Sequence, residues 1–152
     1  TIDANGDISS ILDKKQAREI LSAPVRLAFQ KEHPEYWPAW NMDWNDRKNP
    51  PAGYVDGPAK ITLFETGPVR VCLRIGRSAR NSSFDQYVFL STGESGKRII
   101  IHNDVDWQSK GVSLKASFPL AAANSASSIA GPRSRTRLTC LTSFTCGATT
   151  ER

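Results

Sequence analysis

Residues 60–75 read KITLFETGPVRVCLRI, and this stretch decides the class of fold. Apolar and polar residues alternate over 60–65 and again over 69–75, which is the period-two pattern of strands that bury one face. Between the two runs, Thr66-Gly67-Pro68 carries residue types that favour a tight turn. The stretch therefore predicts two antiparallel strands joined as a β-hairpin.

The same alternation recurs along the chain, with turns rich in Gly between the runs. Further strands are predicted at 25–30, 84–90, 97–102 and 112–118, and Asn5-Gly6 predicts a turn between two strands at the start of the sequence. No stretch sustains a helical period. We therefore expect an all-β protein whose antiparallel strands pack as a β-sandwich.

The sequence has 152 residues, of which 39% are hydrophobic and 23% charged, as expected for one folded domain. No apolar run approaches the roughly 18 residues of a membrane-spanning helix, so we expect no membrane partner. Because it begins at Thr1 without an initiator Met or a signal-peptide pattern, we interpret it as a piece of a longer chain. Its three cysteines form no CxxC pair, which favours a reducing compartment such as the cytoplasm, and we expect Cys72 to be a small buried side chain.

Two segments of the sequence differ in composition. Residues 1–124 carry 16 Lys and Arg against 14 Asp and Glu, so both signs mix as on an ordinary soluble surface. Residues 125–152 carry four Arg against one acidic residue, and 11 of these 28 positions are Ser or Thr. We expect a β-sandwich over 1–124 and a poorly structured tail over 125–152. Nucleic-acid binding through this Arg-rich tail is the weakest alternative, because the folded part shows no basic stripe.

Residues 31–58 form a long loop with five Pro and three of the four Trp. Loops this long inside a compact domain are often functional. Aromatic rings beside Asp and Asn suit a sugar, since the ring stacks on C–H groups and the carboxylate accepts hydroxyl hydrogen bonds. The candidates for substrate binding are Tyr36, Trp37, Trp40, Asp43, Trp44, Asp106 and Trp107. The alternative for each Trp of the loop is that its ring packs the loop onto the sheet.

The densest polar cluster is the stretch His102-Asn103-Asp104-Val105-Asp106. On a strand, Asp104 and Asp106 would face the same side, where two carboxylates can bind a metal or act as acid and base. The favoured alternative is a solvated strand end with local hydrogen bonds. Because no G-x-S-x-G elbow and no Gly-rich phosphate loop occur either, we predict no catalytic and no metal-binding residue in this chain.

Four groups of residues resemble glycoside hydrolase family 38, the α-mannosidases. Residues 5–13 fit N-G-x-I-x-S-I-x-D, and residues 36–43 fit Y-W-x-A-W-[DN]-x-D. Residues 57–70 fit G-P-A followed by E-x-G-P-x-R, and residues 105–119 fit V-D-W followed by L-K-A-x-F-P. Order and spacing agree over about residues 3–124, most closely with the bacterial and cytosolic branch of the family.

The resemblance implies the β-rich region that follows the catalytic domain of a retaining exo-α-mannosidase, as a partial super-sandwich of the galactose-mutarotase type. The catalytic Asp and the divalent metal, commonly zinc, would then belong to the preceding α/β domain, and none of those residues maps onto this sequence. The resemblance thus implies a chain inactive on its own, with the catalytic domain of the same polypeptide and mannose-containing glycans as partners. The alternative function is a free-standing carbohydrate-binding module.

The resemblance ends after Asn124. There the family continues with an aromatic strand and acidic sequence, whereas this chain turns to Ser, Thr and Arg. The abrupt change in charge and composition leads to the hypothesis that residues from about 125 onward are translated in a shifted reading frame.

Overall fold

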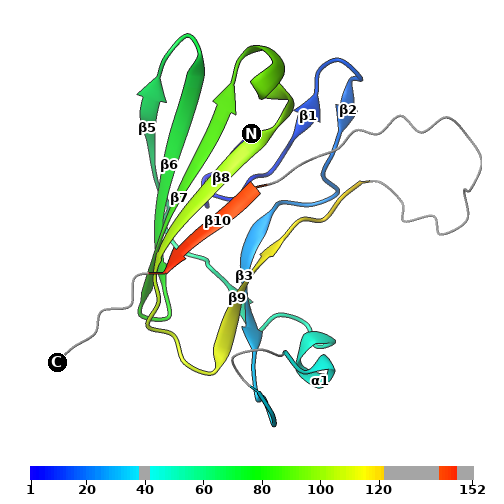
Figure 1. Cartoon of the computed structure of the whole chain (residues 1–152), viewed down its shortest axis with the longest axis vertical. Helices are drawn as coiled ribbons and strands as arrows, with labels where there is room; N and C mark the ends of the chain where they lie inside the picture. The colour runs from blue at the N-terminus through cyan, green and yellow to red at the C-terminus, as the bar shows by residue number, and fades with distance from the viewer. Residues whose placement is uncertain (38–41, 122–140, 147–152) are drawn as a thin grey trace, which may run out of the picture.

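The computed structural model describes residues 1–37, 42–121 and 141–146, the last of these as backbone only (Figure 1). The described strands form a five-stranded sheet in the order β10-β8-β7-β6-β5, a three-stranded sheet β4-β3-β9, and the pair β1-β2. The strands are β1 (Leu12–Asp13), β2 (Arg18–Glu19), β3 (Arg26–Lys31), β4 (Gly53–Tyr54), β5 (Lys60–Thr66), β6 (Arg70–Ala79), β7 (Ser82–Ser91), β8 (Ile99–Asp106), β9 (Val112–Ser117) and β10 (Leu141–Cys146). The helical elements of the described part are α1 (Trp44–Arg47) and the 3-10 helix η1 (Gly93–Lys97).

The predicted hairpin is formed by β5 and β6. Leu63 pairs with Leu73, and the register then shifts so that Glu65 pairs with Cys72. Phe64 is the extra residue of this β-bulge. Cys72 is 0% exposed, as predicted for a small buried side chain, and this burial raises the pKa of its thiol.

The hydrophobic core lies between the five-stranded sheet and the sheet of β4, β3 and β9. Phe29 of β3 meets Phe84 of β7 edge to face, with ring centroids 6.1 Å apart. One cluster comprises Leu27, Phe29, Val55 and Phe84, and a second comprises Ile8, Leu21, Val25 and Ile101. Two sheets that share a core in this way form the predicted β-sandwich.

The smaller sheet covers only part of the larger one. Figure 1 shows β5, β6 and β7 extending past β3 and β9. On the face that carries the buried Ile75, the exposed fractions reach 60% for Leu63, 42% for Val71 and 48% for Leu90. The sandwich is therefore partial, and apolar surface continues from its core to the outside.

The turn predicted near the start of the chain is present, but the strands predicted beside it are reduced to one bridge between Ile2 and Ile8. Oδ1 of Asp3 accepts the backbone N–H of Asn5 at 2.9 Å and of Asp7 at 3.1 Å. Backbone bonds from the N–H of Asp3 to the carbonyl of Asp7 and from the N–H of Ser9 to the carbonyl of Thr1, each 3.0 Å, flank the bridge.

The segment 125–152, for which we expected little fixed structure, contains one described element. This is β10, which runs parallel to β8 from the pair Leu141 and Ile100 to the pair Cys146 and Val105. The other residues of the segment, and the boundary predicted after 124, lie outside the described residues. No local pattern predicts such a strand, because its partner lies about 40 residues away and parallel pairs need a long crossover.

Candidate functional site

The loop between β3 and β4 is fixed at its base by Gln30, whose side chain is buried. Nε2 of Gln30 donates to the carbonyl oxygens of Asp46 at 2.6 Å and of Asn49 at 3.3 Å. The backbone N–H of His33 donates to Oδ2 of Asp46 at 2.6 Å. A buried amide left without partners would cost about 1–3 kcal/mol, so these bonds hold the end of the loop against β3.

Asp43 fixes the middle of the same loop. It precedes α1, and its carbonyl oxygen accepts the N–H groups of Asp46 at 3.1 Å and Arg47 at 3.0 Å. Its carboxylate Oδ2 accepts the N–H of Glu35 at 3.1 Å. Asp43 and Asp46 therefore shape the backbone on which the aromatic residues stand.

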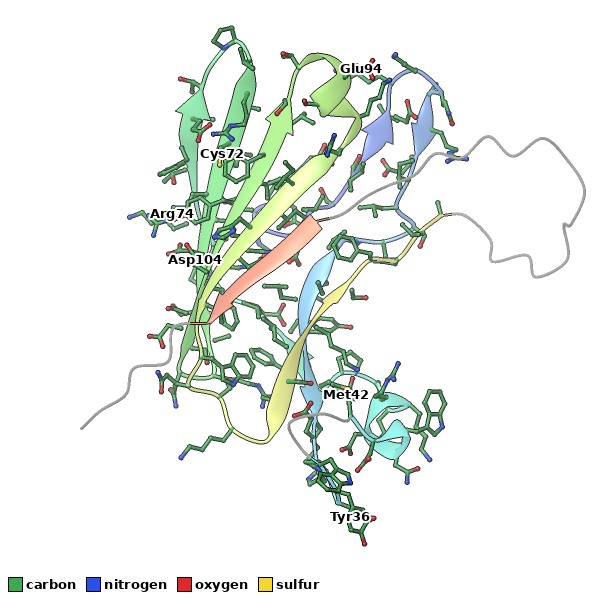
Figure 2. All side chains as sticks on the ribbon, viewed as in Figure 1. Tyr36, Met42, Cys72, Arg74, Glu94 and Asp104 are labelled. Atoms are coloured by element: carbon green, nitrogen blue, oxygen red, sulfur yellow. The ribbon has the colours of Figure 1, made fainter. Side chains whose placement is uncertain are left out.

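We call residues 36–44 the aromatic loop. Tyr36 and Trp37 are each 72% exposed, and Trp44 is 70% exposed. Figure 2 shows Tyr36 at the opposite end of the molecule from Glu94 of η1. The alternative that the ring packs the loop onto the sheet is thus wrong for Trp37 and Trp44, while Trp40 lies outside the described residues.

The structure separates Trp107 from the exposed aromatic residues. Its ring centroid lies 6.0 Å from that of Phe29 and 6.4 Å from that of Phe84, so this partly buried side chain packs against the core. The neighbouring Asp106 is exposed and accepts a hydrogen bond from Nε2 of Gln108 at 2.9 Å. Of the predicted aromatic residues, Tyr36, Trp37 and Trp44 are exposed, whereas Trp107 packs against Phe29 and Phe84.

Asp104 and Asp106 are both exposed on β8, at alternate positions, as predicted. Oδ1 of Asp104 lies 2.8 Å from Nε2 of His102. Among the residues that the structure describes, no group of three His, Cys, Asp or Glu side chains could hold a metal ion.

A small cavity lies between the sheets, lined by residues that include Gly6, Val25, Gln86 and Asn103. Its volume of about 10 Å³ is at the lower limit for one water molecule. The cavity therefore has room for no more than about one water molecule.

Sequence reasoning missed one group of side chains, on the face of β5 to β8 that is turned away from β3 and β9. There Phe64 meets Tyr87 with ring centroids 5.3 Å apart. The signal that could have found it is the extra residue of the β5 bulge, because bulges redirect side chains.

The fold and the site together define a mostly antiparallel β-sandwich domain with exposed aromatic side chains on a loop at one end. The family model described as "Glycosyl hydrolases family 38 C-terminal domain" matches residues 1–143. The chain therefore belongs to glycosyl hydrolase family 38, and the match fits a non-catalytic β domain of such an enzyme. No curated protein matches the sequence.

In the described part of the chain, no helix is both long and apolar enough to span a bilayer.

Proposed function

We propose that this chain is the non-catalytic β domain of an α-mannosidase and that its aromatic loop contacts mannose-containing glycans. The observation that carries the sugar contact is the 70–72% exposure of Tyr36, Trp37 and Trp44 on a loop that Gln30 binds at Asp46 and Asp43 binds at Glu35. Large aromatic side chains that stay in water on a fixed backbone are suited to stacking against a ligand.

The chemistry of the loop favours a pyranose over a charged ligand. A pyranose offers an apolar face of C–H groups, which an indole or phenol ring can cover, and hydroxyl groups that backbone and side-chain oxygens can bind. The carboxylates of Asp43 and Asp46 already accept hydrogen bonds from backbone N–H groups of the loop. In this proposal the aromatic rings therefore supply most of the contact area with the sugar.

In this proposal the catalytic Asp and the zinc belong to the preceding domain of the same polypeptide, as the resemblance implies. The uncovered apolar residues Leu63, Val71 and Leu90 are the surface against which that domain would pack. A partner there would also protect the free edge of β5, the last strand of the five-stranded sheet.

The test of the sugar contact is a titration of the full chain with methyl α-mannoside, followed by Trp fluorescence. We expect quenching in the wild type and its loss when Trp37 and Trp44 are both replaced by Ala. The control Leu12→Ala removes an exposed apolar side chain, 54% exposed, outside the loop and should leave the quenching intact. Equal quenching in the double variant would remove the loop from the proposal.

The alternative is a free-standing carbohydrate-binding module, which the exposed aromatic loop would serve equally well. Sequencing the coding DNA on both sides distinguishes the two. A preceding in-frame α/β domain rich in His and Asp supports the mannosidase, and a start codon next to Thr1 with a stop after Arg152 supports the module. The same DNA read in the other two frames tests the frame-shift hypothesis, which fails if neither frame encodes a family-like continuation after Asn124.

A further inference from the structure

The face of β5 to β8 turned away from β3 and β9, which we call the outer face, carries its own ordered side chains. Residues alternate along a strand, so Arg74 of β6 points opposite to the buried Ile75. Figure 2 shows Arg74 and Asp104 on the side of the sheet away from β3 and β9. The β5 bulge places Phe64 on this face, where its ring meets Tyr87.

Polar and aromatic side chains of the outer face lie in register across three strands. Arg74 pairs with Tyr87, and Tyr87 pairs with His102. In a neighbouring row, Asp85 pairs directly with Asp104. With strands about 4.8 Å apart and same-face residues about 7 Å apart along a strand, these rows span the size of one or two sugar rings.

The polar side chains of the two rows contact one another in pairs. Nε and Nη2 of Arg74 donate to the two carboxylate oxygens of Asp85 at 3.0 and 2.8 Å. Nε2 of His102 lies 2.8 Å from Oδ1 of Asp104. Arg74 and Asp85 therefore form an ion pair on this face, and His102 and Asp104 form a second polar pair beside it.

All of these groups also reach the solvent. Phe64 is 58% exposed, and the side chains of Arg74 and Asp104 are 43% and 51% exposed. A carboxylate in one ion pair still has oxygen lone pairs for a hydroxyl donor, and a guanidinium has further N–H groups for a hydroxyl acceptor. An exposed ring beside fixed donors and acceptors is the combination that a pyranose needs.

We propose that the outer face is a second carbohydrate-binding site, separate from the aromatic loop, formed by Phe64, Arg74, Asp85, Tyr87, His102 and Asp104. The sugar ring stacks on Phe64 beside Tyr87, and its hydroxyls bind to Arg74 and Asp104. Its affinity is modest because the site is open and contains one well-exposed ring. The site itself follows from this surface alone, and only the choice of a mannose sugar as the probe rests on the proposed function.

The test uses the ¹⁵N-labelled full chain titrated with α-1,2-mannobiose and followed by NMR amide shifts. We expect shifts at residues 62–66, 85–88 and 102–104, and an affinity about tenfold weaker at these residues in Phe64→Ala, as expected for one lost stacking contact. The matched control is Leu63→Ala, because Leu63 is 60% exposed on the same strand but on the other face. It should bind like the wild type.

Three outcomes would overturn this site. The first is an absence of shifts at these residues while those of the aromatic loop respond, which would leave the proposed function intact. The second is an equal loss in Leu63→Ala and Phe64→Ala, which would point to general destabilisation. The third is an equal response to inorganic phosphate, which would make the ligand an anion. The variant lacking the rings of Trp37 and Trp44 should keep the outer-face shifts, so the two sites are tested separately.

Discussion

Nη1 of Arg77 donates to Oδ1 of Asp7 at 2.7 Å, although 70 positions separate the two residues in the sequence. Both side chains are almost fully buried, at 1% and 5% exposure. The other carboxylate oxygen of Asp7 lies 3.1 Å from Nε of Arg26 on β3. One carboxylate thus ties the N-terminal turn both to β6 in the five-stranded sheet and to β3 in the three-stranded sheet.

Asp7→Ala should lower the free energy of unfolding by about 3–5 kcal/mol, because it leaves the Arg77 guanidinium buried without its counter-charge. Asp56→Ala is the control, since Asp56 also pairs with Arg26 but its side chain is 61% exposed, so its loss should cost less than about 1 kcal/mol. Urea unfolding followed by circular dichroism measures both. An equal loss of unfolding free energy in the two variants would mean that burial does not determine how much each ion pair contributes to stability.

Gly6→Ala should be destabilising by about 2–5 kcal/mol, from two separate causes. The φ of Gly6 is +81°, and a Cβ there would lie 2.5 Å from Cγ2 of Ile75 and 2.9 Å from Cβ of Ala59. Gly111→Ala separates these causes, because Gly111 has φ +65° but nothing within 4 Å of the added Cβ. We expect it to cost about 1–2 kcal/mol in the same urea experiment. A Gly6 variant no less stable than the Gly111 variant would refute the close packing.

Trp107→Ala should mainly reduce stability, whereas Trp44→Ala should mainly reduce mannoside binding. Removal of Trp107 takes away ring contacts with Phe29 and Phe84 and should cost about 3 kcal/mol. Removal of Trp44, which is 70% exposed, should change stability by less than about 0.5 kcal/mol while it reduces the fluorescence response to mannoside. A stability loss in Trp44→Ala as large as that in Trp107→Ala would place Trp44 in the packing as well.

The isolated chain should show no turnover of an aryl α-mannoside, with or without added zinc. The reason is the resemblance, which puts the nucleophile and the metal in the preceding domain. Incubation of the purified chain with the aryl α-mannoside measures turnover as released chromogenic aryl alcohol. A polypeptide that includes the preceding domain is the positive control. Activity of the chain alone would contradict the assignment as a non-catalytic domain.

The alternation of apolar and polar residues was sufficient to predict most of the sheets. β3, β5 and β9 lie where the period-two runs placed them. The pattern holds even for β5, whose apolar residues Ile61 and Leu63 are 38% and 60% exposed. The alternating pattern therefore predicts a strand with one apolar face even where that face is partly exposed in this structure.

Turn geometry and tertiary contacts explain what the sequence could not predict. β6 and β7 extend to a two-residue turn in which Arg80 and Asn81 have φ values of +50° and +62°. Arg is not typical of such a turn, so no turn was predicted at this position. The predicted strand 69–75 therefore stops before the end of β6 at Ala79. Likewise, Trp107 and Trp44 are the same residue type, so the sequence gives no reason to treat them differently. Trp107 packs against the core because it contacts Phe29, which lies far from it in the sequence.

Glu19 makes the stability of the N-terminal region sensitive to acid. Its Oε2 accepts the hydroxyl of Ser10 at 2.6 Å, and its Oε1 accepts the N–H groups of Ile11 at 2.8 Å and Leu21 at 3.0 Å. These bonds, with the Ser10 hydroxyl first, lower the pKa of Glu19 from 4.5 to about 2. Because the pKa is lower in the folded state, the stabilisation is complete above about pH 4.5 and is lost as the pH falls toward 2.

Glu19→Gln should therefore be less stable than the wild type at neutral pH, and the difference should shrink steadily between about pH 4.5 and pH 2. Ser10→Ala removes the largest cause of the shift, so Glu19 of the folded variant should protonate at a higher pH. Its loss of stability on acidification should therefore be smaller than that of the wild type and should end at a higher pH. Urea unfolding at a series of pH values measures all three proteins. A difference between wild type and Glu19→Gln that stays constant down to pH 2 would mean that the carboxylate charge has no part in holding the backbone of Ile11 and Leu21 together.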